Sequence, residues 1–430
     1  MKLNYKRTFL IGLAFMSISA FWQAYDNIVP LILDNTFHMG ETVTGAIMAL
    51  DNVLALILLP VFGTLSDKVN TRLGRRTPFI LIGTILAITF VTLIPMADNR
   101  GNLILFLVAL GCVLLSMSSY RSPAVALMPD LTPKPLRSKA NAVINLMGAV
   151  GGVYTLIMIK LLVKKTEKPD YTMLFLAVAA VMALAVVILL ITIKENKLRE
   201  EKQALERAAG LTEEEEEEQV QGTGGAMPKD VKKSLIFILA SVMLWFMAYN
   251  AVTTSFSRYA IHVWGLEGGS FADCLMVATV AAIISYIPIG IISSKIGRKR
   301  TILIGITMMT LSYFCGFLFK EFSGLINVVF AFTGIGWAAI GVNSYPMVVE
   351  MSKNSDVGKY TGLYYTFSMT AQIITPIISG FFLEHVSYRT LFPYAVIFSF
   401  GSFCTMLMVK HGDSKPAQKK SMLENFDVDD

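Results

Sequence analysis

Long apolar runs separated by short polar connections follow one another along almost the whole chain. A helix needs about 20 largely apolar residues to cross the hydrocarbon core of a bilayer. The pattern predicts twelve membrane-spanning helices, at residues 8–33, 41–66, 78–97, 102–128, 139–163, 171–193, 233–260, 269–294, 301–319, 325–349, 358–383 and 391–410. We therefore expect an all-α integral membrane protein with almost no residues left for a soluble domain.

Composition supports this interpretation. The chain has 430 residues, of which 54% are apolar and 16% are charged, whereas about 25% of the residues of an ordinary soluble domain are charged. The first apolar run follows MKLNYKR and lacks a small-residue cleavage site. We expect it to be retained as a helix rather than removed as a signal peptide.

The net charge of +6 is spread over the short connections between apolar runs. This distribution argues against a nucleic-acid partner and predicts topology instead. Most Lys and Arg residues of the connections fall on one side of the membrane if the N-terminus is inside, and such an excess marks the cytoplasmic side. We expect a multi-pass protein of the cell membrane, embedded in the lipid bilayer, with both termini in the cytoplasm.

Signals for metal, redox or enzyme chemistry are weak. The four cysteines, at 112, 274, 315 and 404, all fall within apolar runs, where a small hydrophobic role is usual. The four histidines have no paired spacing, and no GxSxG, HExxH or P-loop string occurs. We expect no disulfide, no metal site, no cofactor and no enzymatic activity.

A charged segment at residues 194–232 separates six predicted helices from six. Its run of six Glu residues is compatible with a regulatory or cation-binding tail. We favour a solvated and partly helical linker, because blocks of like charge repel one another. The predicted organisation is an N-terminal six-helix half at 1–193, a cytoplasmic linker at 194–232, a C-terminal six-helix half at 233–410 and a cytoplasmic tail at 411–430.

The two halves repeat each other in short stretches. In order along the chain, YDN matches YNA, GTLSD matches GIISS, and LGRRTPFILIG matches IGRKRTILIG. Asp130 and Glu350 then precede similar polar stretches. Such self-similarity indicates a duplicated six-helix unit, and transporters built this way hold their binding site between the halves near the bilayer midplane.

The connection between the second and third predicted helices carries a dense motif of Gly63, Asp67, Gly74, Arg75 and Arg76. This pattern resembles the major facilitator superfamily. TRLGRRTPFILIG is similar to the glycoside–pentoside–hexuronide:cation symporters and especially to their sucrose/proton symporter branch, as is YRSPAVALMPDL. The resemblance implies a twelve-helix major facilitator fold and transport by alternating access.

Carboxylate–Arg pairs at the cytoplasmic rim can hold the two halves together in one state and release them in another. We expect a cytoplasmic gate formed by Gly63, Asp67, Gly74, Arg75, Arg76, Asp130 and Glu350. In an alternative interpretation, the arginines only enforce the inside-positive topology. Both roles are compatible.

Three ionisable residues lie within the apolar runs of the first half: Asp26, Asp51 and Arg121. Each costs roughly 2.5–3.5 kcal/mol on insertion scales, so each is a candidate for function. We predict that they form one polar track for proton coupling, with Asp51 as the proton carrier. The alternatives are a static pair of Asp51 with Arg121, and hydrogen bonding of Asp26 to a sugar. The acidic pair of the sodium-using relatives would fall at Leu59 and Ala55, which favours protons over sodium.

Sugars bind to aromatic faces and to hydrogen-bonding side chains in an otherwise apolar cavity. Repeat-related helices carry such residues, although packing alone also explains aromatic stripes. The predicted substrate-binding residues are Trp22, Tyr25, Asn141, Asn145, Trp245, Tyr249, Asn250, Asn343, Tyr365 and Gln372. Arg258, near a helix end, is expected to extend its charge to the outer membrane surface.

These features together predict a proton-coupled sugar symporter of the glycoside or disaccharide type. A proton-coupled exporter of drugs or metabolites is the alternative function. The expected partners are a small-molecule substrate, protons and lipid. Since each chain holds both halves, we expect it to function as a monomer.

Overall fold

A computed structural model describes residues 3–166, 168–208, 229–351 and 357–413. The first half consists of α1 (Tyr5–Asn35), α2 (Glu41–Lys68), α3 (Thr77–Asn99), α4 (Leu103–Leu131), the short η1 (Lys134–Leu136), α5 (Arg137–Leu162) and α6 (Thr172–Thr192). Helix α7 (Glu195–Ala208) follows it. The second half consists of α9 (Lys229–His262), α10 (Ala272–Ile296), α11 (Arg298–Leu318), α12 (Leu325–Val349), α13 (Val357–His385), η3 (Tyr388–Thr390) and α14 (Leu391–Leu407).

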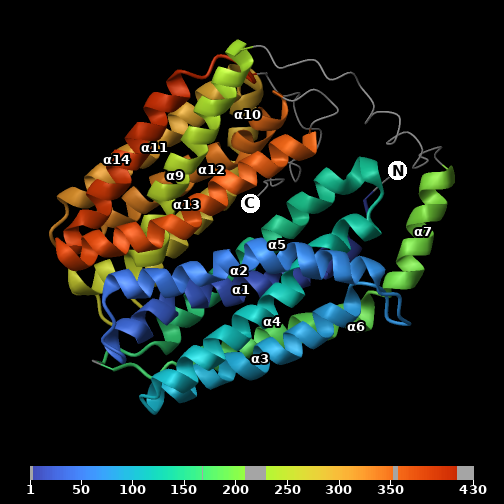
Figure 1. The fold of residues 1–430 in the computed structure, drawn as a ribbon, viewed down its shortest axis with the longest axis horizontal. Coiled ribbons are helices and arrows are strands. Elements are labelled where there is room, and N and C mark those ends of the chain that lie inside the picture. The colour runs from blue at the N-terminus through green and yellow to red at the C-terminus, as the bar shows by residue number, and fades with distance from the viewer. Residues whose placement is uncertain (1–2, 167, 209–228, 352–356, 414–430) are drawn as a thin grey trace.

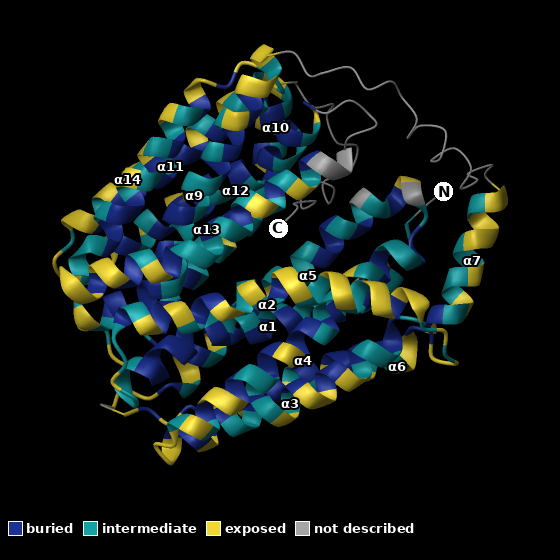
Figure 2. Cartoon of the chain, in the orientation of Figure 1, coloured by how far each residue is buried: buried dark blue, intermediate teal, exposed yellow. Residues whose placement is uncertain are grey.

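The prediction of twelve spanning helices is confirmed. Twelve of the described helices are long and apolar enough to cross a membrane. Exposed residues lie on the outward faces of these helices (Figure 2). Many of them are apolar, for example Ile104, Ile191 and Ile397, which are 77%, 72% and 68% exposed. In lipid, helices of this kind satisfy their backbone hydrogen bonds internally, so only the side chains need a favourable environment.

The two halves lie side by side and meet along three helix pairs (Figure 1). Helix α2 packs against α13, α5 against α10, and α1 against α9. Near the start of α2, a Cβ on Gly45 would lie 2.0 Å from the backbone oxygen of Pro376, so the helices approach too closely there for any larger residue. The two halves are therefore closely packed where α2 begins.

The bundle has two distinct ends. We call the end at which α6 leads into α7 and α9 begins the linker end, and the end at which α1 stops and α2 starts the opposite end. Helix α7 lies across the linker end of the first half, and the ribbons of the two halves diverge toward this end (Figure 1). Helix α7 occupies residues 195–208 of the predicted linker, whereas the six-Glu run and the tail beyond residue 413 lie outside the described residues.

Candidate functional site

A cavity of about 400 Å³ lies between the two halves. Helices α1 and α5 line it from the first half, and α9, α10, α11 and α12 line it from the second. The volume lies within the range of pockets that hold small molecules. Its placement between repeated halves agrees with the location expected for a transporter binding site.

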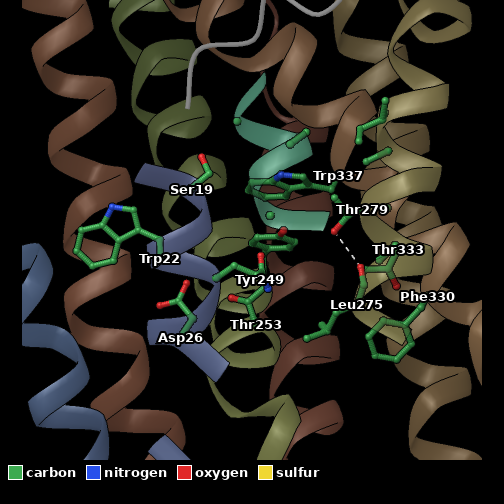
Figure 3. A pocket seen from close by; sticks show the side chains of 18 of the residues that line it. Ser19, Trp22, Asp26, Tyr249, Thr253, Leu275, Thr279, Phe330, Thr333 and Trp337 are labelled. Atoms are coloured by element: carbon green, nitrogen blue, oxygen red, sulfur yellow. Dashed lines mark hydrogen bonds between the residues drawn. The ribbon is translucent and has the colours of Figure 1, made fainter. Parts of the chain in front are cut away.

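One wall of the cavity is aromatic. The rings of Tyr249 and Trp337 stack with their centroids 3.7 Å apart and an interplanar angle of 6°. Phe246 packs edge-on against Trp337 at 5.4 Å. Across the cavity, Trp22 of α1 makes an edge-on contact with Tyr25 at 5.3 Å. Figure 3 shows the Tyr249–Trp337 stack facing the helix that carries Trp22.

The polar groups of the cavity are almost all neutral. Its amide and aliphatic hydroxyl side chains come from Ser19, Gln23, Asn27, Asn145, Asn250, Thr253, Thr279 and Thr333, and Tyr249, Tyr286 and Tyr313 add phenol groups. Among the described residues that line it there is one acid, Asp26, and there is no Lys, Arg or His. Trp22 and Asp26 lie one turn apart on the same side of α1 (Figure 3). The cavity therefore offers hydrogen bonds together with a single ionisable carboxyl group.

The three predicted coupling residues come together in the fold. Asp26 lies within electrostatic range of both Asp51 and Arg121, and Asp51 lies within range of Arg121. The Arg121 guanidinium carbon is 5.9 Å from the centroid of the Trp22 ring. The Asn52 side chain donates a 2.8 Å hydrogen bond to Asp51, which does not line the cavity. Helices α1, α2 and α4 thus place a charged cluster beside the cavity, with Asp26 at its surface.

Four of the predicted substrate-binding residues line the cavity, namely Trp22, Asn145, Tyr249 and Asn250. The other six do not, for reasons of packing. Tyr25, Trp245 and Asn343 are each 1% exposed within the helix bundle. The side chains of Asn141, Tyr365 and Gln372 are half-buried outside the cavity lining.

Sequence reasoning assigned no role to several residues that line the cavity. Thr279 and Thr333 are examples, and each hydroxyl donates to a carbonyl one turn earlier in its own helix, at 2.9 and 3.1 Å. Isolated hydroxyls in apolar helices commonly bond in this way without any ligand. The sequence around Thr279 and Thr333 therefore does not indicate whether their side chains face a cavity or pack against another helix.

The residues of the predicted gate that belong to the first half cluster at its linker end, whereas Glu350 lies in the second half. The Arg76 Nε donates to Asp130 Oδ2 at 2.7 Å, and its other guanidinium nitrogens contact Asp67 and Ser66. The Gly63 carbonyl accepts a further bond from Arg76 at 3.3 Å. The Arg76 side chain is 8% exposed, so α2, α3 and α4 are joined here around one buried cation.

The second half has a simpler version of this cluster. Arg298, at the start of α11, pairs with Glu350 at the end of α12, with an N···O distance of 2.6 Å. The repeat counterpart of Asp67 is Ser294, whose hydroxyl donates to the Ile291 carbonyl of its own helix. In the second half, the Arg298–Glu350 pair therefore joins two helices through one carboxylate. In the first half, Arg76 joins three helices through two carboxylates.

Ion pairs at the opposite end join one half to the other. Glu41 of α2 and Arg258 of α9 lie 3.0 Å apart, with side chains 5% and 3% exposed, and the Tyr388 hydroxyl donates to Glu41 at 2.6 Å. His262 lies 2.7 Å from Asp34. The expectation that Arg258 extends to the membrane surface is wrong, because the chain supplies a buried acid from the other half.

Comparisons with known proteins place these observations in a family. The model of the Major Facilitator Superfamily matches residues 9–285 and 264–426. The sucrose transport protein SUC3 of Arabidopsis thaliana is 28% identical over 137 residues, which cover 27% of this chain and 23% of that protein. The match therefore spans about a quarter of the curated relative. The chloramphenicol resistance protein CraA of Acinetobacter baumannii is 26% identical over 168 residues, covering 37% of this chain and 38% of that protein.

A solved structure extends the likeness to the whole fold. A crystal structure of the peptide transporter POT in complex with sulfate superposes with a TM-score of 0.70, at 12% identity, covering 94% of this chain and 93% of that one. Two repeated six-helix halves, a cavity between them and a family model that matches most of the chain agree with one another. The chain belongs to the Major Facilitator Superfamily, as the resemblance of its Gly63–Arg76 motif implied.

Proposed function

We propose that this chain is a proton-coupled sugar symporter of the cell membrane that works by alternating access. The observation that carries the proposal is the position of Asp26. It is the one acid among the described residues that line a cavity between the halves, and it lies within electrostatic range of Asp51 and Arg121. The carboxyl group of Asp26 therefore lies between the cavity and the neighbouring residues Asp51 and Arg121.

The chemistry of the cavity favours a neutral, hydroxyl-rich substrate. Amide and hydroxyl side chains suit the hydroxyl groups of a sugar, and the faces of Trp22 and Trp337 suit its C–H surface. Described residues of the lining provide no cationic side chain for a carboxylate or phosphate substrate. The partial likeness to a sucrose transport protein points in the same direction.

The proposal of proton coupling is supported by the cost of charge inside the membrane. A carboxylate there is tolerated when it neutralises a cation or binds a proton. Asp51 is the proposed proton carrier, with Arg121 as the cation that competes with the proton. Asp26 is proposed to couple this exchange to the substrate, because it faces the cavity. A hard cation such as sodium prefers several oxygen ligands, and the positions at which the sodium-using symporters carry their acidic pair are Leu59 and Ala55 in this chain.

Alternating access requires that each end of the bundle opens in turn. We assign the linker end to the cytoplasm, from the excess of Lys and Arg in its connections. The pairs Glu41–Arg258 and Asp34–His262 then close the extracellular end. The Arg76 and Arg298 clusters form the facing cytoplasmic rims. One chain contains every part of this machinery, so we propose a functional monomer.

An exporter of drugs or metabolites is the second candidate. The partial likeness to the chloramphenicol resistance protein CraA favours it. An aromatic cavity with one carboxylate also suits an organic cation. The two functions differ in the substrate that binds and in the direction of coupled flux.

Transport in proteoliposomes tests the proposal. Purified protein should exchange radiolabelled neutral mono- or disaccharides in counterflow, and an imposed inward proton gradient should drive their accumulation at constant sodium. Asp51→Asn should abolish accumulation and keep sugar-for-sugar exchange, because the variant mimics the protonated acid. Glu321→Gln, at an exposed connection, is the matched control and should transport normally.

Three outcomes would contradict the proposal. The first is sodium-dependent accumulation at clamped pH. The second is the absence of counterflow for every neutral sugar, together with export of drugs. The third concerns Asp51 alone: if its loss abolishes exchange and Arg121→Gln restores it, the two residues form a structural pair rather than a proton carrier with its partner.

A further inference from the structure

Helix α7 lies at the linker end of the first half (Figure 1), and side chains of its first two turns bind it there. The Asn196 side chain donates to the carbonyls of Thr71 and Arg72 at 3.0 and 3.2 Å. Leu198 packs against the hydrophobic core, and Glu201 pairs with Arg7 of α1 at 3.4 Å. Although α7 belongs to the predicted linker, it is part of the structure of this half.

The first residue of α7, Glu195, is 2% exposed and points at the start of α3. Its carboxylate accepts the backbone N–H groups of Arg75 at 2.7 Å, Arg76 at 3.0 Å and Thr77 at 2.9 Å, and the Thr77 hydroxyl at 2.7 Å. The N-terminus of a helix exposes N–H groups that lack intrahelical partners and favours negative charge. Arg76, the N-cap residue of α3, makes no side-chain cap of its own. Glu195 provides that cap from a segment about 120 positions further along the chain.

The glycine of the motif is explained by the same contact. Gly74 has φ +123°, and a Cβ there would lie 2.2 Å from Glu195 Oε2. Both its backbone conformation and the room that the carboxylate needs exclude a larger residue. The motif and the linker helix therefore form one unit.

We infer that Glu195 is a positioning residue of the cytoplasmic gate, which fixes the start of α3 and thereby holds the Arg76 guanidinium between Asp67 and Asp130. The backbone of Arg76 is held by Glu195, while its side chain is held by Asp67 and Asp130. With both held, the rim of the first half presents an ordered surface to the second half. The inference rests on the proposed alternating access, and it depends on neither the substrate nor the coupling ion.

The second half repeats the arrangement in reduced form. Asp413, which follows α14 as Glu195 follows α6, accepts the backbone N–H of Lys299 at 2.9 Å at the start of α11. Gly297 has φ +96°, and a Cβ there would lie 2.8 Å from Asp413 Oδ1. In each half, an acid that follows the last helix thus accepts a backbone N–H group at the start of the third helix. This repetition indicates that the cap is a feature of the duplicated unit and does not result from chance packing of the linker.

The test measures how readily the cavity opens to the cytoplasm. A single cysteine, Ala149→Cys in the cavity wall of α5, is introduced after the four native cysteines are replaced by serine. Its labelling by a membrane-impermeant maleimide from the cytoplasmic side needs neither sugar nor a proton gradient. Glu195→Gln keeps the shape of the side chain and removes its charge. Glu201→Gln on the same helix, whose side chain is 42% exposed, is the matched control.

We expect Glu195→Gln to raise the labelling rate about threefold or more, because a loosened Arg76 disfavours cytoplasmic closure, whereas Glu201→Gln should stay within about twofold. Glu195→Asp keeps the charge on a shorter side chain and should give an intermediate rate. The combination of Glu195→Gln with Arg76→Ala should label no faster than Arg76→Ala alone, since residues that act through one another are not additive.

Three results would overturn the inference: wild-type labelling in Glu195→Gln, equal rates in the Gln and Asp variants, or additive effects with Arg76→Ala. If Glu195→Gln is not monodisperse, Glu195→Asp replaces it in the test. The double variant of Glu195→Asp and Arg76→Ala should then label no faster than Arg76→Ala alone, and additive labelling rates would overturn the inference. If the proposed sugar substrate or proton coupling is wrong, transport assays would show it. The labelling rates would still test the role of Glu195, because labelling needs neither sugar nor a proton gradient.

Discussion

Ion pairs at the two ends of the helix bundle join different partners. At the opposite end, Glu41 and Arg258 connect the two halves. At the linker end, Arg76 binds Asp67 and Asp130 within the first half. Pairs of the first kind must separate before their end can open. Pairs within one half can stay intact when that end opens. They order the surface that contacts the other half when the end closes.

The ion pairs that join the two halves differ in how far they are buried. The side chains of Glu41 and Arg258 are nearly inaccessible, whereas those of Lys160 and Asp273 are 49% and 33% exposed. Removing one partner of a buried pair leaves an uncompensated charge, but an exposed pair contributes little. The opposite end is therefore expected to depend mainly on one buried contact.

The largest effect is expected for Arg258→Ala. The variant leaves Glu41 buried without its cation, at a cost of about 3–5 kcal/mol to the state closed at that end. Labelling of the Ala149→Cys reporter from the side proposed to be extracellular should rise by more than about tenfold. Arg389→Ala is the control, because that guanidinium lies over Phe317 of its own half at 5.7 Å.

A double variant sharpens the same point. Glu41→Gln together with Arg258→Gln removes both charges, and replacing a whole buried pair is often close to neutral. Labelling of the double variant should return toward the wild-type rate. If the double variant labels as fast as Arg258→Ala, the pair does not hold this end closed.

A smaller effect is expected at the linker end for Asp67→Asn. Arg76 keeps Asp130, so the rim is weakened rather than lost. Net transport should slow severalfold while equilibrium binding of the proposed sugar substrate changes little, since Asp67 lies about 24 Å along α2 from Asp51. Initial uptake rates and equilibrium binding are compared in the same preparation. A loss of binding equal to the loss of transport would show that Asp67 is no gate residue.

The smallest effect is expected for Lys160→Gln. Its pair with Asp273 joins α5 to α10 at 2.7 Å but is open to solvent. Exposed pairs contribute about 0–1 kcal/mol and weaken further in salt. Reporter labelling and uptake should change by less than about twofold. A change as large as that of Arg258→Ala would mean that burial does not rank the cross-half pairs.

Much of the architecture could be predicted from the chain alone. The twelve apolar runs became the twelve candidate spans, and the motif around Gly74 and Arg76 indicated the superfamily that the family model shows. The charged residues Asp26, Asp51 and Arg121, which the sequence singled out, lie within electrostatic range of one another; their role in coupling stays a prediction. Ionisable residues are so costly in an apolar run that their positions alone mark them.

The residues of the cavity wall were harder to predict. Trp22 and Tyr249 line it, but Tyr25 and Trp245 are packed into the bundle although they lie on the same helices. In a soluble helix an apolar stripe reveals the buried face, but a membrane helix is apolar all round. Helix rotation is then set by packing against neighbours, which the pattern along one helix does not encode.

By itself, then, the sequence determined the number of spans, the duplicated halves and the family, because hydrophobic length, repetition and motif spacing are local properties of the chain. Only the tertiary structure decided that Arg258 meets Glu41 and that Glu195 caps α3. Both contacts join residues more than 100 positions apart through side chains that look like ordinary surface charges in the sequence. A buried charge is stable only beside its partner, and the partner is chosen by how the helices pack.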